Sequence, residues 1–533
     1  MRPQEWIAHD PDPTTAAELG AWSADEIATR FAHPLRFGTA GLRGPVRAGP
    51  DAMNVATVLR ASWAVASVFA ALNRADAADN LTAVVGHDAR HGSKEFAIAT
   101  AETLSADGFS VFLLPGTAPT PVVAFATRTS GARVGIQITA SHNPASDNGY
   151  KVYCAGGVQI NTPLDGDIEQ AMAQSPPADQ IPRRPVPPDT ARGATMIDAY
   201  INRAAAIRRG RGDVRVALTA LHGVGGEVAV RALNRAGVND VHCVAAQFDP
   251  DPDFPTVSFP NPEEPGATDA VLSLAAEVEA DVAIALDPDA DRCAVGIRDK
   301  SGWRMLSGDE TGWLLGDYIL STTADPAEAV VASTLVSSRM LTAIAAAYGA
   351  THVETRTGFK WLARADEGLP GSLVYAYEEA IGHCVDPEAV RDKDGISTAV
   401  LVCDLVSALI HEGRSVPEEL DSLARRHGIH QVAAVSRRFS TVAEVDTAYQ
   451  RIRTAPPTVL GDFPATVTDL TDAVIISGGA DDTTARVVVR ASGTEPKLKF
   501  YLEARCGDTT HLAAARQRAQ AVLDRVATDL ASW

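Results

Sequence analysis

The chain has 533 residues, of which 46% are hydrophobic and 6% aromatic, and its 67 acidic against 47 basic side chains give a formal net charge of −20. This length favours three or four domains, and the composition is that of an ordinary soluble globular protein. The acidic balance argues against non-specific nucleic-acid binding, so an anionic substrate requires a local group of basic side chains.

The six cysteines are scattered singly, which predicts a reduced, cytoplasmic protein. The first ten residues, MRPQEWIAHD, lack the apolar core of a signal peptide. The most apolar stretch, around 63–72, is expected to be a buried helix that is too short and too rich in alanine to span a membrane. We therefore expect no membrane partner.

Short β-rich runs alternate with alanine-rich helical stretches along most of the chain, which predicts α/β layers. The predicted strands are 83–85, 134–138, 214–218, 282–286, 330–332 and 374–377. The predicted helices are 55–72, 93–105, 228–236, 267–279 and 311–320. Two proline-rich stretches, 176–188 and 250–265, are predicted to be loops or linkers.

The last hundred residues follow a different pattern. Residues 485–490 and 498–504 alternate apolar and polar side chains around the turn-rich sequence ASGTEPK, which predicts an antiparallel hairpin. A predicted helix, 510–530, follows. This region is expected to be a separate small α+β domain.

The sequence TASHNP follows the predicted strand 134–138 and places Ser141 at its end, with Lys151 ten residues further on. Ser141 is either a turn residue or a nucleophile. A nucleophilic hydroxyl needs a base or an activated substrate, and the absence of a Gly-x-Ser-x-Gly elbow argues against a serine hydrolase.

The sequence AIALDPDADRCAVGI places Asp287, Asp289 and Asp291 directly after an apolar strand. Two such charges at ~4 Å repel by about 4 kcal/mol at an effective dielectric constant near ~20, so a hard cation such as Mg²⁺ or Ca²⁺ is expected. An EF-hand is excluded because Arg292 and Arg298 occupy its glycine and glutamate positions. A phosphatase with an aspartyl nucleophile and a solvated acidic turn remain alternatives.

The sequence RVVVRASGTEPKLKF gathers basic and hydroxyl side chains on one turn. Glycine lets backbone N–H groups approach an anion, hydroxyls donate hydrogen bonds, and a guanidinium binds phosphate in a bidentate manner. The residues concerned are Arg490, Ser492, Gly493, Thr494 and Lys497. This turn is the expected basic site, although an ordinary hairpin turn would use similar residues.

A phosphate on Ser141 beside a three-carboxylate metal site would act as a store of phosphoryl groups. Mg²⁺ would neutralise charge as the phosphoryl group leaves, and Lys151 is near enough along the chain to assist in proton transfer. Taken together and in this order, TASHNP, DPDADR and RASGTEPK resemble the phosphoserine, metal and phosphate-binding loops of the α-D-phosphohexomutase family.

The resemblance extends over essentially the whole chain. It includes FGTAGLRG (37–44), GHDAR (86–90), PTP (119–121), TGFKW (357–361) and YEEAIG (377–382). With LHGVG (221–225), the last two look like the phosphoglucomutase-2-like branch.

The family implies an α/β fold of four domains around a central cleft, the first three having mixed sheets. We expect domain I at 1–195 with the phosphoserine loop and domain II at 196–302 with the metal loop. Domain III is expected at 303–425 with the sugar loop, and an α+β domain IV at 426–533 with the phosphate loop.

The resemblance also implies roles for individual residues. The implied catalytic residues are Ser141, Lys151, Arg43 and His142. The implied metal ligands are Asp287, Asp289, Asp291 and phosphorylated Ser141. The implied substrate-binding residues are Arg292, Thr357, Gly358, Lys360, Glu378, Glu379, Arg490, Ser492, Gly493, Thr494 and Lys497.

The implied reaction interconverts hexose 1-phosphate and hexose 6-phosphate through a 1,6-bisphosphate, with Mg²⁺ as cofactor and glucose 1,6-bisphosphate as activator. The expected partner is a phosphosugar. In the sugar loop, Ala380 replaces a serine found in many members of the family. A phosphopentomutase, a glucose 1,6-bisphosphate synthase, a metal-dependent sugar phosphatase and a non-catalytic phosphosugar sensor remain alternatives, and the oligomeric state is open.

Overall fold

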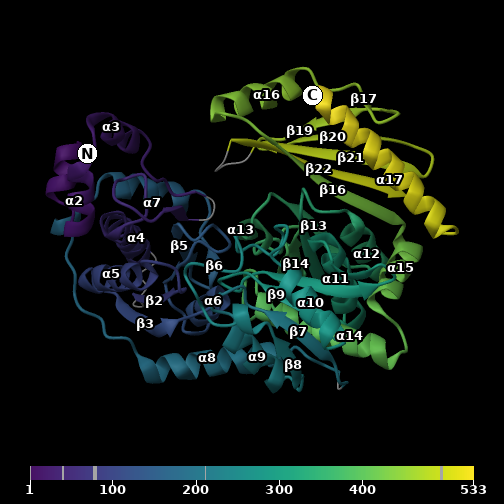
Figure 1. Cartoon of the computed structure of the whole chain (residues 1–533), viewed down its shortest axis with the longest axis horizontal. Coiled ribbons are helices and arrows are strands. Elements are labelled where there is room, and N and C mark those ends of the chain that lie inside the picture. Colours follow the sequence, from purple (N-terminus) through teal and green to yellow (C-terminus); the bar gives the residue numbers. More distant parts are fainter. Residues whose placement is uncertain (1, 39–40, 76–80, 211, 492–495) are drawn as a thin grey trace. The chain divides into compact units, whose positions relative to one another are not determined.

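The structure is a computed structural model, and it describes residues 2–38, 41–75, 81–210, 212–491 and 496–533 (Figure 1). It divides into two compact units. The first unit comprises Met1–Leu306, Gly358–Arg364 and Val374–His411. The second comprises Ser307–Thr357, Ala365–Leu373 and Glu412–Trp533. The sheets and helices are those of the predicted α/β fold. The arrangement of its domains around a central cleft stays a prediction.

Three short helices at the N-terminus have no counterpart among the predicted elements. They are α1 (Pro3–Ala8), α2 (Pro13–Ala21) and α3 (Ala24–Ala32). Their start signals are local: α1 and α2 begin with proline, Asp12 accepts a hydrogen bond from the N–H of Thr14, and Ser23 forms a capping box with Glu26.

The first sheet has the strand order β1-β5-β4-β2-β3, with β6 paired to β5. Its strands are β1 (Leu42–Pro45), β2 (Thr82–His87), β3 (Ser110–Thr117), β4 (Val134–Ile138), β5 (Asp147–Cys154) and β6 (Val158–Gln159). Strand β2 is parallel to β3 and β4, whereas β5 runs antiparallel to β4, so the sheet is mixed as predicted. All five residues of β4 are buried, and Gln137, the polar residue among them, donates from Nε2 to the Ala118 carbonyl at 2.8 Å.

Five helices and one 3₁₀ turn accompany this sheet and the following segment. They are α4 (Val55–Ala75), α5 (Ser93–Ala106), α6 (Thr120–Thr129), α7 (Leu164–Ala173), η1 (Ala178–Gln180) and α8 (Thr190–Ala205). By length and composition, α4 could cross a membrane over Val55–Arg74, so the expectation that this stretch is too short was wrong. However, 61% of that window is buried inside the structure, as in the core helix of a globular domain.

The second sheet has the order β11-β10-β9-β7-β8. Its strands are β7 (Arg215–Thr219), β8 (Asp240–Cys243), β9 (Val282–Leu286), β10 (Cys293–Asp299) and β11 (Gly302–Met305). The accompanying helices are α9 (Gly226–Arg235), η2 (Ala245–Gln247) and α10 (Asp269–Glu277). The predicted strand 282–286 coincides with β9, which runs antiparallel to β10, so a tight loop joins the two. The predicted loop 250–265 contains no helix or strand.

The segment from residue 307 to residue 427 contributes elements to both units. Its helices are α11 (Gly308–Thr322), η3 (Pro326–Glu328), α12 (Met340–Tyr348), α13 (Phe359–Leu362), α14 (Gly395–His411) and α15 (Val416–His427). Its strands are β12 (Ala329–Thr334), β13 (Thr351–Thr355), β14 (Ser372–Glu378) and β15 (Gly382–Cys384). In the second unit β12 is parallel to β13. In the first unit the part of β14 from Val374 onward forms an antiparallel hairpin with β15.

The C-terminal region is the small α+β module that the sequence predicts. Its sheet has the order β16-β22-β21-β20-β19, and the predicted hairpin is the antiparallel pair β21–β22. The strands are β16 (Ile429–Arg438), β17 (Val459–Leu460), β18 (Phe463–Pro464), β19 (Thr466–Asp469), β20 (Val474–Ala480), β21 (Thr483–Ala491) and β22 (Lys497–Cys506). Helices α16 (Val442–Thr454) and α17 (Leu512–Asp529), followed by η4 (Leu530–Ser532), pack on this sheet (Figure 1).

Candidate active site

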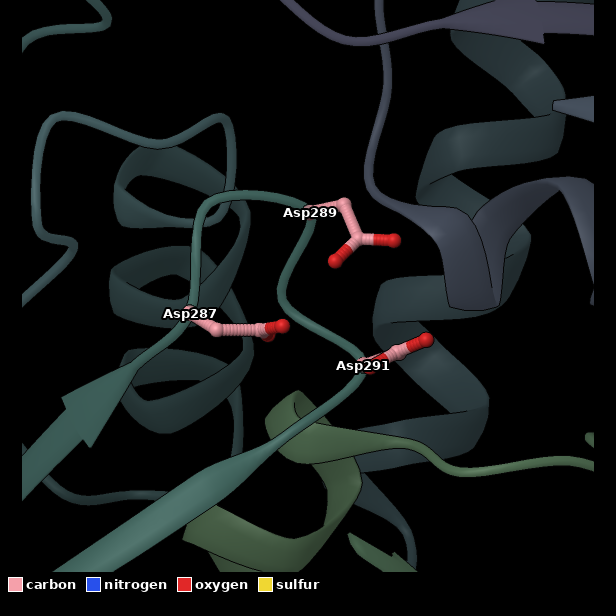
Figure 2. A group of neighbouring side chains, drawn as sticks. All are labelled: Asp287, Asp289 and Asp291. Carbon is pink, nitrogen blue, oxygen red and sulfur yellow. The ribbon is translucent and has the colours of Figure 1, made fainter. Parts of the chain in front are cut away.

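Three aspartates on the loop between β9 and β10 form the centre of the site (Figure 2). Asp287, Asp289 and Asp291, which we call the aspartate trio, are each 0% exposed, and their carboxylate oxygens lie within 4.8 Å of one another. The N–H of Ala290, which has a positive φ of 57°, donates to the Asp287 carbonyl at 2.9 Å and closes a tight turn. The solvated acidic turn is therefore excluded, and the trio could hold a metal ion.

Two carboxylate oxygens of the trio make no hydrogen bond within the described part of the chain that would compete with a metal ion. Asp289 Oδ1 and Asp291 Oδ1 are buried and have no hydrogen-bond partner among the described residues. Such oxygens are costly to bury unpaired, and a hard divalent cation takes carboxylate oxygens as its ligands. The donor set therefore fits Mg²⁺.

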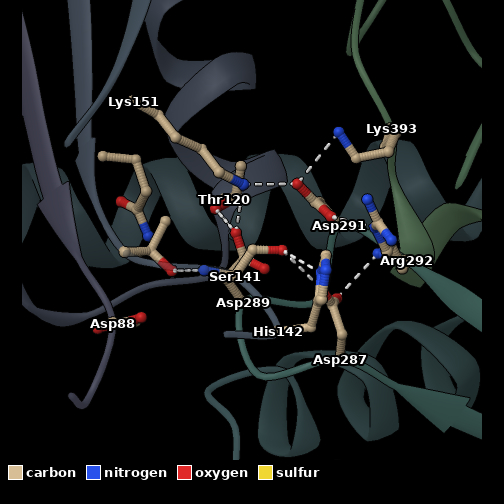
Figure 3. Close-up of polar contacts among 12 residues, drawn as sticks. Asp88, Thr120, Ser141, His142, Lys151, Asp287, Asp289, Asp291, Arg292 and Lys393 are labelled. Carbon is tan, nitrogen blue, oxygen red and sulfur yellow. Dashed lines mark hydrogen bonds and ion pairs between the residues drawn. The ribbon is translucent and has the colours of Figure 1, made fainter. Parts of the chain in front are cut away.

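The hydroxyl of Ser141 reaches the trio. Ser141 follows β4 with a positive φ of 54°, and its N–H donates to Thr139 Oγ1 at 2.9 Å. Its Oγ donates to Asp287 Oδ2 at 3.0 Å and lies 3.2 Å from His142 Nδ1 (Figure 3). A serine held in the left-handed region stores local strain, which recurs at functional sites.

The position of Lys151 follows from the hairpin β4–β5. Because β5 runs antiparallel to β4, Lys151 lies opposite Gln137 and returns to the end of the sheet that carries Ser141. Its ammonium donates to Asp289 Oδ2 and to Asp291 Oδ2, both at 2.6 Å (Figure 3). The sequence predicts a lysine beside Ser141, and its pairing with two metal-loop carboxylates is a finding of the structure.

Two further side chains join the cluster, and neither is among the predicted site residues. The Lys393 ammonium lies 3.3 Å from Asp291 Oδ2, and Thr120 Oγ1 donates to Asp289 Oδ2 at 2.5 Å (Figure 3). Two sequence patterns could have indicated these residues. Lys393 lies between two aspartates in RDKDG (391–395), and Thr120 is the central residue of the PTP motif (119–121).

The charges of the cluster shift its pKa values in opposite directions. Burial and the neighbouring carboxylates raise the pKa of Asp287 well above its ordinary value. Burial also opposes ionisation of Asp291, but the charges of Lys151 and Lys393 outweigh it and lower the pKa of that carboxyl. Burial lowers the pKa of His142 well below its ordinary value, so its imidazole is neutral near pH 7.

Arg292 connects the metal loop to the predicted sugar loop. Its Nη2 lies 3.5 Å from Glu378 Oε1, and its backbone forms a bridge with Gly382 of the β14–β15 hairpin. The N–H of Cys293 donates to the Ile381 carbonyl at 3.1 Å. Residues predicted from two separate motifs therefore lie together, and Glu379, on the same turn, is half-buried.

Two arginines support the serine loop. Arg43, on β1, is predicted from the sequence, and its Nη1 donates to Asn143 Oδ1 at 3.5 Å. Arg90 belongs to the GHDAR motif but is not among the predicted site residues, and it donates from Nη2 to the carbonyls of Ser141 at 2.7 Å and Asn143 at 2.5 Å. The loop thus takes its shape from a buried guanidinium supplied by the turn that follows the neighbouring β2.

The LHGVG sequence (221–225) packs directly against the metal loop. Val224 donates its N–H to the carbonyl of Pro288 at 2.8 Å. A Cβ added to Gly223 would lie 2.4 Å from Pro288 Cα, and one added to Gly225 would lie 2.5 Å from the Cβ of Ala290. Only glycine lets the two loops pack this closely.

The other predicted residues lie elsewhere or outside the described part of the chain. Lys360 is buried, with Nζ 3.3 Å from Asp165 Oδ2, so the structure pairs it with that carboxylate and not with the trio. The other predicted site residues of the TGFKW motif (357–361) are Gly358, which belongs to the first unit, and Thr357, which belongs to the second. The substrate roles of these residues stay predictions.

The predicted phosphate loop belongs to the second unit. Arg490 lies near the end of β21 and Lys497 begins β22, so the two flank the turn as expected. The Nη2 atom of Arg490 lies 3.9 Å from Asp472 Oδ2. The remaining predicted residues of this loop lie outside the described residues: Ser492, Gly493 and Thr494.

Family models match the chain in four successive segments. Models of the phosphoglucomutase/phosphomannomutase alpha/beta/alpha domains I, II and III match residues 34–178, 197–302 and 307–427, and a model of the C-terminal domain matches residues 462–520.

Curated relatives and a solved structure agree with these matches. A probable phosphomannomutase of Haemophilus influenzae is 39% identical over 437 residues, which are 80% of this chain and 88% of that protein. A probable phosphoribomutase of Schizosaccharomyces pombe is 34% identical over 547 residues, 94% of this chain and 93% of that protein. The structure of a phosphoglucomutase/phosphomannomutase family protein from Burkholderia thailandensis has a TM-score of 0.67 at 19% identity and covers 90% of this chain and 95% of that one, which shows a similar fold.

Proposed function

The chain belongs to the phosphoglucomutase/phosphomannomutase family and is a mutase, and from this premise we propose that it interconverts hexose 1-phosphate and hexose 6-phosphate through a phosphate carried on Ser141. One observation carries the proposal. The buried Ser141 hydroxyl donates to Asp287 Oδ2 at 3.0 Å, although 146 residues separate the two in sequence. A hydroxyl held against a three-carboxylate cation site is suited to accept and release a phosphoryl group.

The residues that would hold Mg²⁺ are the aspartate trio and the phosphate on Ser141. When bound, the ion would supply positive charge that stabilises the transferring phosphoryl group. The chain adds cations of its own around the same loops: the buried Lys151 and Lys393 and the half-buried Arg43 and Arg292. These residues would add to the basic side chains of the predicted phosphate-binding turn, which an anionic substrate of an acidic chain requires.

Each transfer exchanges one bond for another at phosphorus. The bond between phosphorus and the Ser141 oxygen breaks, a bond to the sugar hydroxyl forms, and that hydroxyl loses its proton while the serine oxygen gains one. Lys151 is held as an ammonium because the charges of Asp289 and Asp291 outweigh its burial and raise its pKa. It therefore carries a proton that it can give only to a strongly basic atom such as the departing serine oxygen, and we assign it that role. The imidazole of His142, kept neutral by its lowered pKa, lies 3.2 Å from the Ser141 oxygen and can orient it through a hydrogen bond.

The sugar would be recognised by the β14–β15 turn. Glu378 and Glu379 offer carboxylates for sugar hydroxyls, and Arg292 orients Glu378 from 3.5 Å. The two orientations of a bisphosphate intermediate place different hydroxyls at this turn, so a flexible acceptor such as a carboxylate suits it. Arg490 and Lys497 would bind the phosphate that does not react.

The S. pombe relative favours a second candidate within the same chemistry. Because a probable phosphoribomutase aligns over 94% of this chain, a pentose 1-phosphate and pentose 5-phosphate pair is the alternative substrate. Ala380 supports it, since alanine removes a hydroxyl that would otherwise be available to a hexose. With either substrate, glucose 1,6-bisphosphate would be the activator that phosphorylates Ser141. We place the reaction in the cytoplasm.

A time course of ³¹P NMR tests these candidates. Purified protein with Mg²⁺ would receive glucose 1-phosphate, mannose 1-phosphate or ribose 1-phosphate, each with a trace of glucose 1,6-bisphosphate. Movement of the signal to the 6- or 5-phosphate without inorganic phosphate is expected, and the relative rates identify the sugar. Release of inorganic phosphate would instead support a phosphatase, and no change in any sample would support a phosphosugar sensor.

A further inference from the structure

The proline-rich loop 250–265 of the first unit contacts the turn that follows β2, and the proposed function gives this loop no role. The guanidinium carbon of Arg90 lies over the ring of Phe254, 5.0 Å from its centre, and His91 Nε2 lies 2.7 Å from Asp253 Oδ1. Arg90 lies in the segment that matches the family's domain I, and Phe254 lies in the segment that matches domain II. The loop therefore joins the segment that carries Ser141 to the segment that carries the aspartate trio.

The two contacts differ in burial. Arg90 and Phe254 are 4% and 3% exposed, whereas the side chains of His91 and Asp253 are 53% and 73% exposed. An exposed ion pair contributes little, because water and salt screen it. A guanidinium removed from water is attracted more strongly to the negative face of an aromatic ring. The contact between Arg90 and Phe254 is therefore the one that can fix the position of a side chain.

Arg90 transmits this contact to the serine loop. Its Nη1 donates to the carbonyls of Pro144 at 2.6 Å and Asp147 at 3.0 Å, in addition to the bonds from Nη2 to the carbonyls of Ser141 and Asn143. Hydrogen bonds from an ionised donor are stronger than those between neutral groups. The position of one guanidinium therefore sets the positions of four carbonyls in the serine loop.

The backbone at Phe254 has an unusual conformation. Its φ is 46°, in the left-handed region that a bulky residue seldom adopts. Its N–H donates to the Asp251 carbonyl at 3.2 Å, and its carbonyl accepts from the N–H of Val257 at 3.1 Å. Strained residues persist where the surrounding structure enforces them, and they cluster at functional sites. The turn thus holds the ring against Arg90 at a local cost.

The same loop also contacts the support of the metal loop. The N–H of Asp251 donates to the His222 carbonyl at 3.0 Å, and His222 Nε2 lies 2.8 Å from Thr256 Oγ1. His222 precedes Gly223, whose backbone packs against Pro288 of the metal loop. One loop therefore touches the residues behind the aspartate trio and the arginine behind the serine.

We propose that Phe254 is a positioning residue for phosphoryl transfer: its ring fixes the guanidinium of Arg90, and thereby the serine loop, relative to the aspartate trio. The proposal rests on the proposed function, because the placement of the Ser141 oxygen against the trio matters for the rate only if Ser141 carries the phosphate. A displacement of about 1 Å in such a geometry can reduce the rate by about 100-fold. Phe254 acts through Arg90 and the serine loop.

Hydrogen–deuterium exchange of the full chain, followed by mass spectrometry, tests the positioning without any turnover. In Phe254→Leu, which stays apolar but has no ring, the amides of segment 139–149 should exchange about tenfold faster than in the wild type. Phe112→Leu is the matched control, because Phe112 is also buried in the first unit and has the Arg192 guanidinium over its ring at 4.1 Å. The control should leave the exchange of segment 139–149 unchanged. Since this measurement needs no activity, failure of the mutase assay and failure of this proposal are distinguishable.

Kinetic measurements separate positioning from a merely structural role. Phe254→Leu should lower kcat by about tenfold or more and leave the Mg²⁺ affinity unchanged, because the ring acts on the serine loop and not on the carboxylates. Incorporation of 3,4,5-trifluorophenylalanine at position 254 keeps the shape of the ring but weakens its negative face, so it tests the contact even if Phe254→Leu does not fold. It should change exchange and kcat in the same directions. Wild-type exchange of segment 139–149 in both Phe254 variants, an unchanged kcat beside an active wild type, or an equal fall of kcat in Phe112→Leu would overturn the proposal.

Discussion

Replacing Gly223 by alanine should displace the metal loop without touching any of its ligands. The added Cβ would lie 2.4 Å from both Cα and O of Pro288, the residue between Asp287 and Asp289. Ordinary contacts at a Cβ begin near 3.4 Å, so the Pro288 backbone must retreat by about 1 Å. Both obstructing atoms belong to the backbone, so no side-chain rotation relieves the contact.

The size of the effect follows from this displacement. Overpacking of a buried position costs about 1–3 kcal/mol of unfolding free energy. A displacement of about 1 Å in catalytic geometry can reduce the rate by about 100-fold. We therefore expect Gly223→Ala to lower kcat/KM by about two orders of magnitude and to weaken Mg²⁺ binding, with a moderate fall in Tm.

Three measurements on the same variant check this reasoning: the mutase rate, the Mg²⁺ affinity from calorimetric titration, and the Tm with and without Mg²⁺. Gly20→Ala is the matched control, because a Cβ at Gly20 meets no atom within 4 Å. The control should behave as the wild type. If Gly223→Ala kept both its Mg²⁺ affinity and its mutase rate, the contact between Gly223 and Pro288 would have no part in shaping the metal loop.

Three further predictions follow from the site and from the second unit. Ser141→Ala should remove nearly all turnover and the phosphate adduct seen by intact-protein mass spectrometry after incubation with glucose 1,6-bisphosphate; near-normal turnover would disprove the phosphoserine mechanism. Chelation of Mg²⁺ should abolish turnover while circular dichroism reports an intact fold, because the burial of the trio is already supported by Lys151 and Lys393; retained turnover would rule out the metal. Burial opposes ionisation of Glu503, but hydrogen bonds from His430 and Ser338 outweigh it and lower the pKa of the carboxyl from 4.5 to about 2. The stabilisation is therefore complete above about pH 4.5 and lost as the pH falls toward 2, so the difference in unfolding free energy between wild type and Glu503→Gln, up to about 3 kcal/mol at pH 7, should shrink with acidification; a constant difference would refute the assignment.

Local sequence patterns predicted the strands that carry the site. The predicted strands 134–138 and 282–286 coincide with β4 and β9. Every residue in both is buried, and the side chains are apolar throughout 282–286 and at all positions of 134–138 except Gln137. The sequence did not predict elements whose hydrophobic pattern is weaker. The N-terminal helices are short and only partly buried, and β5, which carries Lys151, contains the polar and glycine residues DNG at its start.

The sequence also predicted those parts of the site that depend on residue type and on close spacing along the chain. Three aspartates at alternate positions after a buried strand predicted a cation site, and the structure brings their oxygens within 4.8 Å of one another. The serine at the end of β4 was identified as a turn residue or a nucleophile, and the two readings are compatible, since its turn conformation directs the hydroxyl to Asp287.

Only the tertiary structure decided which of these groups meet. Lys151 pairs with Asp289 across 138 residues and Arg90 holds the carbonyl of Ser141 across 51 residues. Local sequence fixes the period of a strand and the sharpness of a turn, because those depend on neighbouring residues. The partner of a buried charge depends instead on sheet order, strand direction and the packing of one sheet's loops against another's, which a single sequence does not encode in any local pattern.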